Sequence, residues 1–205
     1  MSVYLQYVLI AAVAYCVGSI SFGIILSKVF KGPDLHTVGS GSTGASNVLR
    51  TMGVKMGLLT LVGDFSKALL VCLISGWITH DPWAVRIAGL ACIIGHNWPV
   101  FFKFKGGKGV ASSCGVMTAC FPVAGLISMI SAVIIIATTR FISLGSMCML
   151  SLFAILVSFF FSDGNIWIIA WAVLLAGLCI WRHRSNIDRL VHGKERKIGQ
   201  KEKIN

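Results

Sequence analysis

The chain contains little charge, and especially little negative charge. Charged residues make up 12% of the 205 residues, and Asp and Glu number only 7 against 18 Lys and Arg. A soluble domain of this length has about twice that fraction of charged residues. Hydrophobic residues make up 56% of the chain, and the mean hydropathy is +0.85. This composition argues against a soluble globular domain and predicts an all-α integral membrane protein.

Several common catalytic signatures are also missing. The seven cysteines lie in apolar stretches without a Cys-x-x-Cys pair, so they are expected to act as small apolar residues. There is no cluster of metal ligands, no Gly-x-Ser-x-Gly elbow and no Gly-Lys-Ser/Thr closing a Walker loop. We therefore expect no metal site. Any chemistry then depends on positioning and on stabilisation of charge.

Long apolar runs alternate with short basic segments. A bilayer span needs about 20 apolar residues. The basic segments are 28–55, 103–108, 140 and 182–203, whereas the connectors 80–82 and 162–164 contain Asp and no Lys or Arg. The positive-inside rule puts the basic segments in the cytoplasm, with the N-terminus outside and the C-terminus inside. The apolar runs cover about 4–29, 54–79, 83–102, 110–139, 142–161 and 165–182.

The positions of the basic residues explain the net charge and indicate whether the first apolar run is a signal peptide. A net charge of +11 is typical of many nucleic-acid-binding proteins, but here the charge sits in short loops beside spans. We therefore expect membrane lipids as partners and no nucleic acid. No basic residue precedes Lys28, so the first run is predicted to be a retained span and not a signal peptide.

The run 110–139 must begin and end on the same side, because Lys108 and Arg140 flank it. Pro122 interrupts the run near its middle. We predict a short helix over about 110–121, a turn at Phe121–Pro122 and a second helix over about 123–139, which gives about seven short transmembrane helices. A re-entrant first piece is the alternative. The whole is predicted to be one polytopic domain over 1–192, followed by a basic cytoplasmic tail over 193–205.

Two charged residues lie inside the second apolar run. Asp64 and Lys67 are three residues apart, so they share a helix face and can pair. Charges at membrane depth are costly and usually face a polar interior. A structural ion pair between helices is one interpretation, and support for an active-site loop is the other.

The first of three polar segments is GSGSTGASNVLR (39–50). Glycines here permit a tight loop whose N–H groups point at one anion, and Arg50 adds a bidentate fork for phosphate. A helix beginning at Ala45 would present its N-terminus to the same anion. A flexible Gly/Ser linker is the alternative. The candidate phosphate-binding residues are Ser40, Gly41, Gly44, Asn47 and Arg50.

The second polar segment is GHNWPVFFKFKGGKG (95–109). Lys108 stands between glycines at the start of the next helix, where it can reach a phosphate held at the helix end. Lys103 and Lys105 are expected to contact anionic headgroups. For His96, a packed histidine and a substrate-binding histidine remain equal alternatives.

The third polar segment is RHRSNIDRL (182–190). His183 and Asn186 are three residues apart and would face the same way on a helix. His183 can act as a general base or donate to phosphate. A fourth candidate, Arg140–Ser146, starts a span, where Ser143 and Ser146 can cap the helix or help to bind phosphate.

In this order and between these spans, the motifs resemble the PlsY-type acyl-phosphate:glycerol-3-phosphate acyltransferases of bacteria. The resemblance covers about residues 4–192, with Ser42 and Ser46 where the family usually has Asn and Thr. It implies an inner-membrane enzyme with seven helices that transfers an acyl chain from acyl phosphate to the 1-hydroxyl of glycerol 3-phosphate, yielding lysophosphatidic acid and phosphate. It further implies no cofactor and a transient contact with a soluble phosphate acyltransferase that supplies the donor.

By the same resemblance, the two phosphate sites are lined by Ser40, Arg50, Lys108, His183, Asn186 and a serine at 143 or 146. We expect catalytic roles for Arg50, Lys108 and His183, and convergence of the polar segments at the cytoplasmic face. The proton acceptor is open between His183 and a substrate phosphate. A small transporter of organic phosphates is the alternative function, although the sequence shows no inverted repeat.

Overall fold

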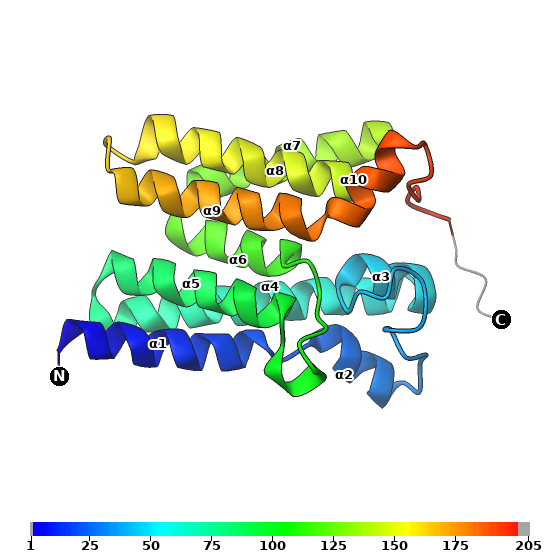
Figure 1. Cartoon of the computed structure of the whole chain (residues 1–205), viewed down its shortest axis with the longest axis horizontal. Helices are drawn as coiled ribbons and strands as arrows, with labels where there is room; N and C mark the ends of the chain where they lie inside the picture. The colour runs from blue at the N-terminus through cyan, green and yellow to red at the C-terminus, as the bar shows by residue number, and fades with distance from the viewer. Residues whose placement is uncertain (1, 201–205) are drawn as a thin grey trace. The chain divides into compact units, whose positions relative to one another are not determined.

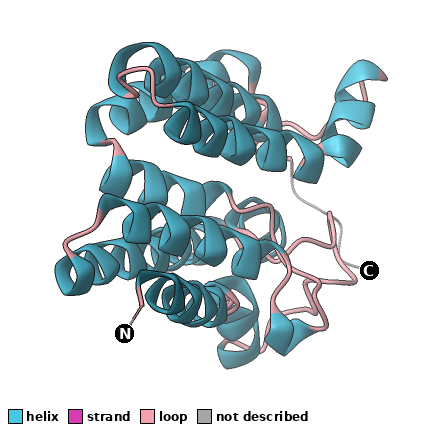
Figure 2. Cartoon of the chain, turned by 60° about the vertical axis from the view of Figure 1, so that its left-hand side comes forward, coloured by secondary structure: helices cyan, strands magenta, loops and turns pink. Residues whose placement is uncertain are grey.

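A computed structural model describes residues 2–200, and within that range every regular element is helical (Figure 2). The chain forms two compact units, 2–120 and 121–200 among the described residues. The single polytopic domain over 1–192 stays a prediction. Each unit is described by itself.

The first unit contains six helices within its described residues. Helix α1 packs along α5, and α4 contacts α3, α5 and α6 (Figure 1). Glycines allow α1 and α5 to approach closely, because a Cβ on Gly18 would lie 2.1 Å from the carbonyl oxygen of Cys92. The helices are α1 Val3–Gly18, α2 Phe22–Val29, α3 Ala45–Met52, α4 Val54–Thr79, α5 Pro82–Asn97 and α6 Val110–Cys120, with a 3₁₀ turn at Val100–Phe102.

The second unit is built around α8. Helices α7 and α9 both pack against α8, which continues into a π turn at Val157–Phe161 (Figure 1). Phe121, Phe153 and Trp171 form an aromatic cluster with ring centroids 6.2–6.3 Å apart. The helices are α7 Pro122–Thr139, α8 Ile142–Leu156, α9 Ile166–Arg182 and α10 Arg184–Val191.

Within residues 2–200, five stretches of helix are long and apolar enough to cross a bilayer, and α9 with α10, bent by 60°, makes a sixth if counted as one span. Large apolar side chains such as Trp77 and Phe159 are exposed, as lipid-facing residues are. The predicted break in the fourth run is confirmed, because α6 ends at Cys120 and Pro122 occupies the first turn of α7. These findings establish a multi-pass helical membrane protein.

The first apolar run differs from a straight helix. Helix α1 ends at Gly18 and α2 starts at Phe22, so two carbonyl groups at the break lose their helical donors. The Lys67 ammonium donates to both, at 2.9 Å to the oxygen of Gly18 and 2.6 Å to that of Ile20. A long-range contact therefore stabilises the break.

Candidate functional site

The glycine-rich loop before α3 is organised by the buried side chain of Asn47. Its Oδ1 accepts the Ser40 N–H at 2.9 Å, and its Nδ2 lies 2.8 Å from the Ser42 carbonyl oxygen. Gly39 and Gly41 take positive φ values of 61° and 69°, and a Cβ on Gly39 would lie 2.2 Å from Asn47 Oδ1. The structure therefore gives Asn47 a loop-holding role.

This loop is not the open ring of N–H donors that the glycine spacing suggests. The N–H groups of Ser40, Gly41 and Gly44 donate to Asn47, Val38 and Ser42 within the loop. Gly44 has a φ of −80°, so it is an ordinary N-cap position and not a left-handed glycine. Of the candidate residues in this segment, Ser40 has a half-buried hydroxyl and Arg50 lies half-buried on the last turn of α3.

The second polar segment folds back over the end of α5. The Gly107 N–H donates to the carbonyl oxygen of His96 at 3.1 Å, and Gly107 lies against the imidazole, since a Cβ there would sit 2.1 Å from Nε2. Gly109 has a φ of 78° and directly precedes α6. Lys108 is thus held, half-buried, at the N-terminus of α6, as predicted from the glycines that flank it.

Asn97 is a polar residue whose importance the sequence does not reveal. It is 1% exposed, and neither its Nδ2 nor its Oδ1 has a hydrogen-bond partner in the part of the chain that the structure describes. A Cβ on Gly109 would lie 2.9 Å from Asn97 Oδ1, so the amide lies beside the start of α6. Buried amides are normally paired, so the unpaired amide makes Asn97 a candidate donor to a ligand at that helix end.

Asp64, Lys67 and His96 form a buried charge network in the first unit. Lys67 Nζ is 2.8 Å from Asp64 Oδ1 and 3.1 Å from His96 Nδ1, and His96 Nδ1 is 3.5 Å from Asp64 Oδ1. The predicted pair therefore forms, and it includes a residue of the second polar segment. Because the same imidazole touches Gly107, the network supports the loop that carries Lys108.

In the second unit, the carboxylate of Glu195 accepts hydrogen bonds from three side chains. Its Oε1 accepts from Ser143 Oγ at 2.8 Å and from Asn186 Nδ2 at 2.7 Å, and its Oε2 accepts from Arg189 Nε at 2.8 Å. Burial acts to raise the pKa of Glu195, but the hydrogen bonds from Asn186, Ser143 and Arg189 outweigh it and hold the pKa below its usual range. Ser143 and Asn186 are therefore brought together, as the candidate site requires.

Glu195 was missed because it lies in a basic stretch expected to be a solvated tail. Most described residues of that stretch are exposed, but Glu195 is buried and the Ile198 N–H donates to the Arg140 carbonyl oxygen at 2.8 Å. A lone acid between Lys194 and Arg196 was the available signal. Residues 201–205 of the predicted tail lie outside the described residues.

His183 is buried where α9 ends. Its Nδ1 lies 2.8 Å from the Cys179 carbonyl oxygen, which accepts only if Nδ1 carries a proton. In the neutral ring, Nε2 is then the atom with a lone pair. The Asn186 N–H donates to the His183 carbonyl oxygen at 2.7 Å, so these two residues are also brought together.

The expected helix cap does not form. Ser146 Oγ donates to the Ile142 carbonyl oxygen at 2.8 Å and α8 has no side-chain cap, so neither Ser143 nor Ser146 caps it. His183 and Asp188 also show the His-x₄-Asp spacing of another class of lipid acyltransferases. Asp188 is exposed and lies 3.3 Å from His192, so this spacing forms no catalytic dyad.

The fold and these polar clusters define a class of protein: a multi-pass helical membrane protein whose helix ends carry residues of the kinds that bind phosphate. Residues 8–193 match the family model described as glycerol-3-phosphate acyltransferase. A glycerol-3-phosphate acyltransferase of Thermoanaerobacter pseudethanolicus is 42% identical, covering 96% of this chain and 98% of its own. One of Paraburkholderia phymatum is 40% identical, covering 97% and 96%. The chain belongs to the glycerol-3-phosphate acyltransferase family.

Solved structures agree with this assignment. The glycerol 3-phosphate form of PlsY, an integral membrane glycerol 3-phosphate acyltransferase, is 38% identical with a TM-score of 0.87, covering 94% of this chain and 96% of its own. The lysophosphatidic acid form gives 37% identity and a TM-score of 0.84, covering 95% and 96%. The resemblance expected from the three motifs is confirmed.

Proposed function

We propose that this protein is a membrane enzyme that transfers a fatty acyl group from acyl phosphate to the 1-hydroxyl of sn-glycerol 3-phosphate. The products are lysophosphatidic acid and inorganic phosphate. The observation that carries the proposal is the nearly end-to-end match, over residues 8–193, to the acyltransferase family. Its structural relatives are described with glycerol 3-phosphate and with lysophosphatidic acid, a substrate and a product of this reaction.

The reaction needs little activation of the acyl donor. Acyl phosphate is a mixed anhydride, so the substrate hydroxyl oxygen attacks the carbonyl carbon, an ester bond forms, and the bond to the phosphate oxygen breaks. The enzyme must mainly hold two phosphate groups close together against their repulsion. Arg50, Lys108 and the N-terminus of α6 with Asn97 supply the charge and the donors in the first unit.

The second unit supplies oriented hydrogen-bonding groups. An amide nitrogen carries two protons, so Asn186 can donate to Glu195 and to a substrate phosphate together. The single hydroxyl proton of Ser143 points to Glu195, so Ser143 acts by fixing that carboxylate. His183 can accept the proton of the attacking hydroxyl at Nε2, and a substrate phosphate is the alternative acceptor.

The membrane topology belongs to the same proposal. The five candidate spans, together with α6 and α9, would make seven crossings, with the N-terminus outside and the C-terminus cytoplasmic. We assign the protein to the bacterial inner membrane with its active site on the cytoplasmic face. The acyl phosphate would then come from a soluble phosphate acyltransferase through transient contact.

The test is phosphate release by the purified full-length chain in detergent, with acyl phosphate and glycerol 3-phosphate. Release that requires both substrates supports the proposal, and acyl-CoA should not replace acyl phosphate. Lys108→Met is expected to lower kcat/KM about 100-fold or more, since a charge at a phosphate is lost. Lys55→Met, at an exposed lysine of α4, is the matched control and should change little. No release under any condition, with uptake of phosphate esters into liposomes, would favour the transporter.

A further inference from the structure

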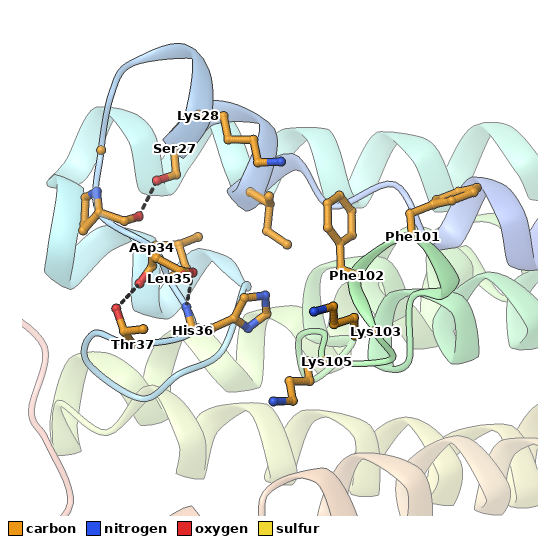
Figure 3. Close-up of a pocket in the computed structure, with 13 residues that line it drawn as sticks. Ser27, Lys28, Asp34, Leu35, His36, Thr37, Phe101, Phe102, Lys103 and Lys105 are labelled. Atoms are coloured by element: carbon orange, nitrogen blue, oxygen red, sulfur yellow. Dashed lines mark hydrogen bonds between the residues drawn. The ribbon is translucent and has the colours of Figure 1, made fainter.

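The first unit has a cavity that contains none of the proposed catalytic residues. Its volume is about 770 Å³, and it lies between α2, the loop over residues 32–37 and the turn over residues 101–105 (Figure 3). The walls are Ile24, Ser27, Lys28, Gly32, Pro33, Asp34, Leu35, His36, Thr37, Phe101, Phe102, Lys103 and Lys105. The acyl transfer proposed above therefore leaves this cavity without a role.

The lining of the cavity combines apolar and cationic side chains. Ile24, Leu35, Phe101 and Phe102 make the apolar part. Ser27 is not available to a ligand as a donor, because its hydroxyl donates to the Pro33 carbonyl oxygen at 2.6 Å. An occupant must therefore combine an apolar portion with a charged group.

The charge of the cavity is strongly positive. Lys28, Lys103 and Lys105 are exposed at its edge, and no ion pair within 4.0 Å involves any of them among residues 2–200. Asp34 is the one acid in the wall, and its Oδ1 already accepts the His36 N–H at 3.0 Å. Three lysines and one aspartate give the wall a formal charge of +2. This charge favours a ligand with net negative charge over a zwitterion.

The cavity also lies where two candidate spans end. These spans are Val3–Val29 and Pro82–Phe102, which contribute α2 and the phenylalanine wall. Phe101 is 59% exposed, and the Lys28 ammonium lies 5.9 Å from the Phe102 ring centroid. An aromatic surface next to lysines at a span end is the arrangement that contacts lipid chains and headgroups together.

We propose that this cavity binds one anionic phospholipid of the surrounding bilayer, with its phosphate between the lysines and its glycerol and upper chains along Phe101 and Phe102. Lysines are point charges on flexible stems, and the lining has no arginine fork. Such a site responds to net charge and does not distinguish a phosphate monoester from a diester. The lining contains none of the residues proposed for acyl transfer, so we assign the occupant as a resident lipid and not a reactant, and the inference does not depend on the acyl transfer.

The experiment measures lipid affinity by native mass spectrometry of the full-length protein in a neutral detergent. The probes are phosphatidylglycerol and phosphatidylcholine with identical chains, and lysophosphatidic acid with one of those chains. Lys28→Gln/Lys103→Gln/Lys105→Gln should lower phosphatidylglycerol affinity roughly 100-fold, at about 1 kcal/mol for each lysine, and leave phosphatidylcholine affinity unchanged. The matched control, Lys55→Gln/Lys194→Gln/Lys197→Gln, removes equal charge from exposed lysines outside the cavity and should stay near wild type.

A gain of affinity provides the complementary test, because misfolding cannot produce it. Asp34→Asn keeps the oxygen that accepts the His36 N–H and removes the one negative charge of the wall, so phosphatidylglycerol affinity should rise about fivefold. Equal losses in the two triple variants, or no change in Asp34→Asn, would overturn the proposal. So would a loss confined to lysophosphatidic acid, since that outcome would identify a reactant site.

Discussion

Replacing Lys67 with Met should destabilise the protein far more than removal of a surface lysine. Lys67 and Asp64 are almost fully buried, and Lys67 Nζ lies 2.8 Å from Asp64 Oδ1. The Lys67 ammonium also donates hydrogen bonds to the carbonyl oxygens of Gly18 and Ile20. The variant would leave a buried carboxylate without its cation and two carbonyls without their donor. Breaking a buried pair in this way costs about 3–5 kcal/mol. For a chain of this size, about 2–4 °C per kcal/mol predicts a fall in unfolding temperature on the order of 10 °C.

Tryptophan fluorescence during heating in detergent measures this change. Lys55→Met lies on the same helix at an exposed position and should shift the unfolding temperature by less than about 2 °C. The double variant Asp64→Leu/Lys67→Met removes both charges and should regain at least half of the loss. If Lys67→Met unfolds at the temperature of Lys55→Met, or if the double variant is no better than the single one, the buried charge does not cause the effect.

Three further outcomes are expected. Gly107→Ala should lower the acyl-transfer rate at least about tenfold, because its Cβ would meet His96 Nε2 at 2.1 Å, whereas Gly177→Ala, with no atom within 4 Å, should have little effect. His183→Gln should reduce kcat about 10²–10⁴-fold if His183 is the base, and a variant that keeps most of its kcat would assign the proton to the substrate phosphate. The hydrogen bonds from Asn186, Ser143 and Arg189 hold the folded-state pKa of Glu195 below its ordinary value, so their stabilisation is complete above that ordinary value and is lost as pH falls through the lower, folded-state pKa. Unfolding temperatures measured against pH should show this acid loss in wild type and lack it in Glu195→Gln.

Helix ends within apolar runs were predictable because local chemistry determines them. Pro122 cannot continue a preceding helix, and the structure separates α6 from α7 at that position. The predicted helix 123–139 matches Pro122–Thr139 to within one residue at its start. The break between α1 and α2 was not predictable in this way. Its carbonyls depend on Lys67, 47 residues further along the chain from Ile20, and no local pattern encodes that contact.

The polar segments likewise contain some features that the local sequence predicts and others that depend on the packing of the folded chain. Cations beside glycines were recognised from sequence, because a fixed charge at a helix start has a simple chemical meaning. The loop-holding role of Asn47 could not be recognised in this way, because its hydrogen bonds with the Ser40 N–H and the Ser42 carbonyl oxygen exist only in the folded loop. Glu195 was not recognised because a charged residue between Lys194 and Arg196 is expected to be solvated, whereas in the structure its side chain is buried.

Taken separately, the two units carry different kinds of candidate phosphate-binding groups. The first unit contributes positive charge through Arg50 and Lys108, and in the second unit the charge of Arg189 is balanced by Glu195. A carboxylate in a phosphate-binding region would repel the substrate if it were unpaired, but Ser143, Asn186 and Arg189 satisfy its oxygens. Its net effect is to orient Asn186 without adding negative charge. Losses of substrate affinity should accordingly dominate in variants of the first unit, and losses of orientation, visible in kcat, in variants of the second.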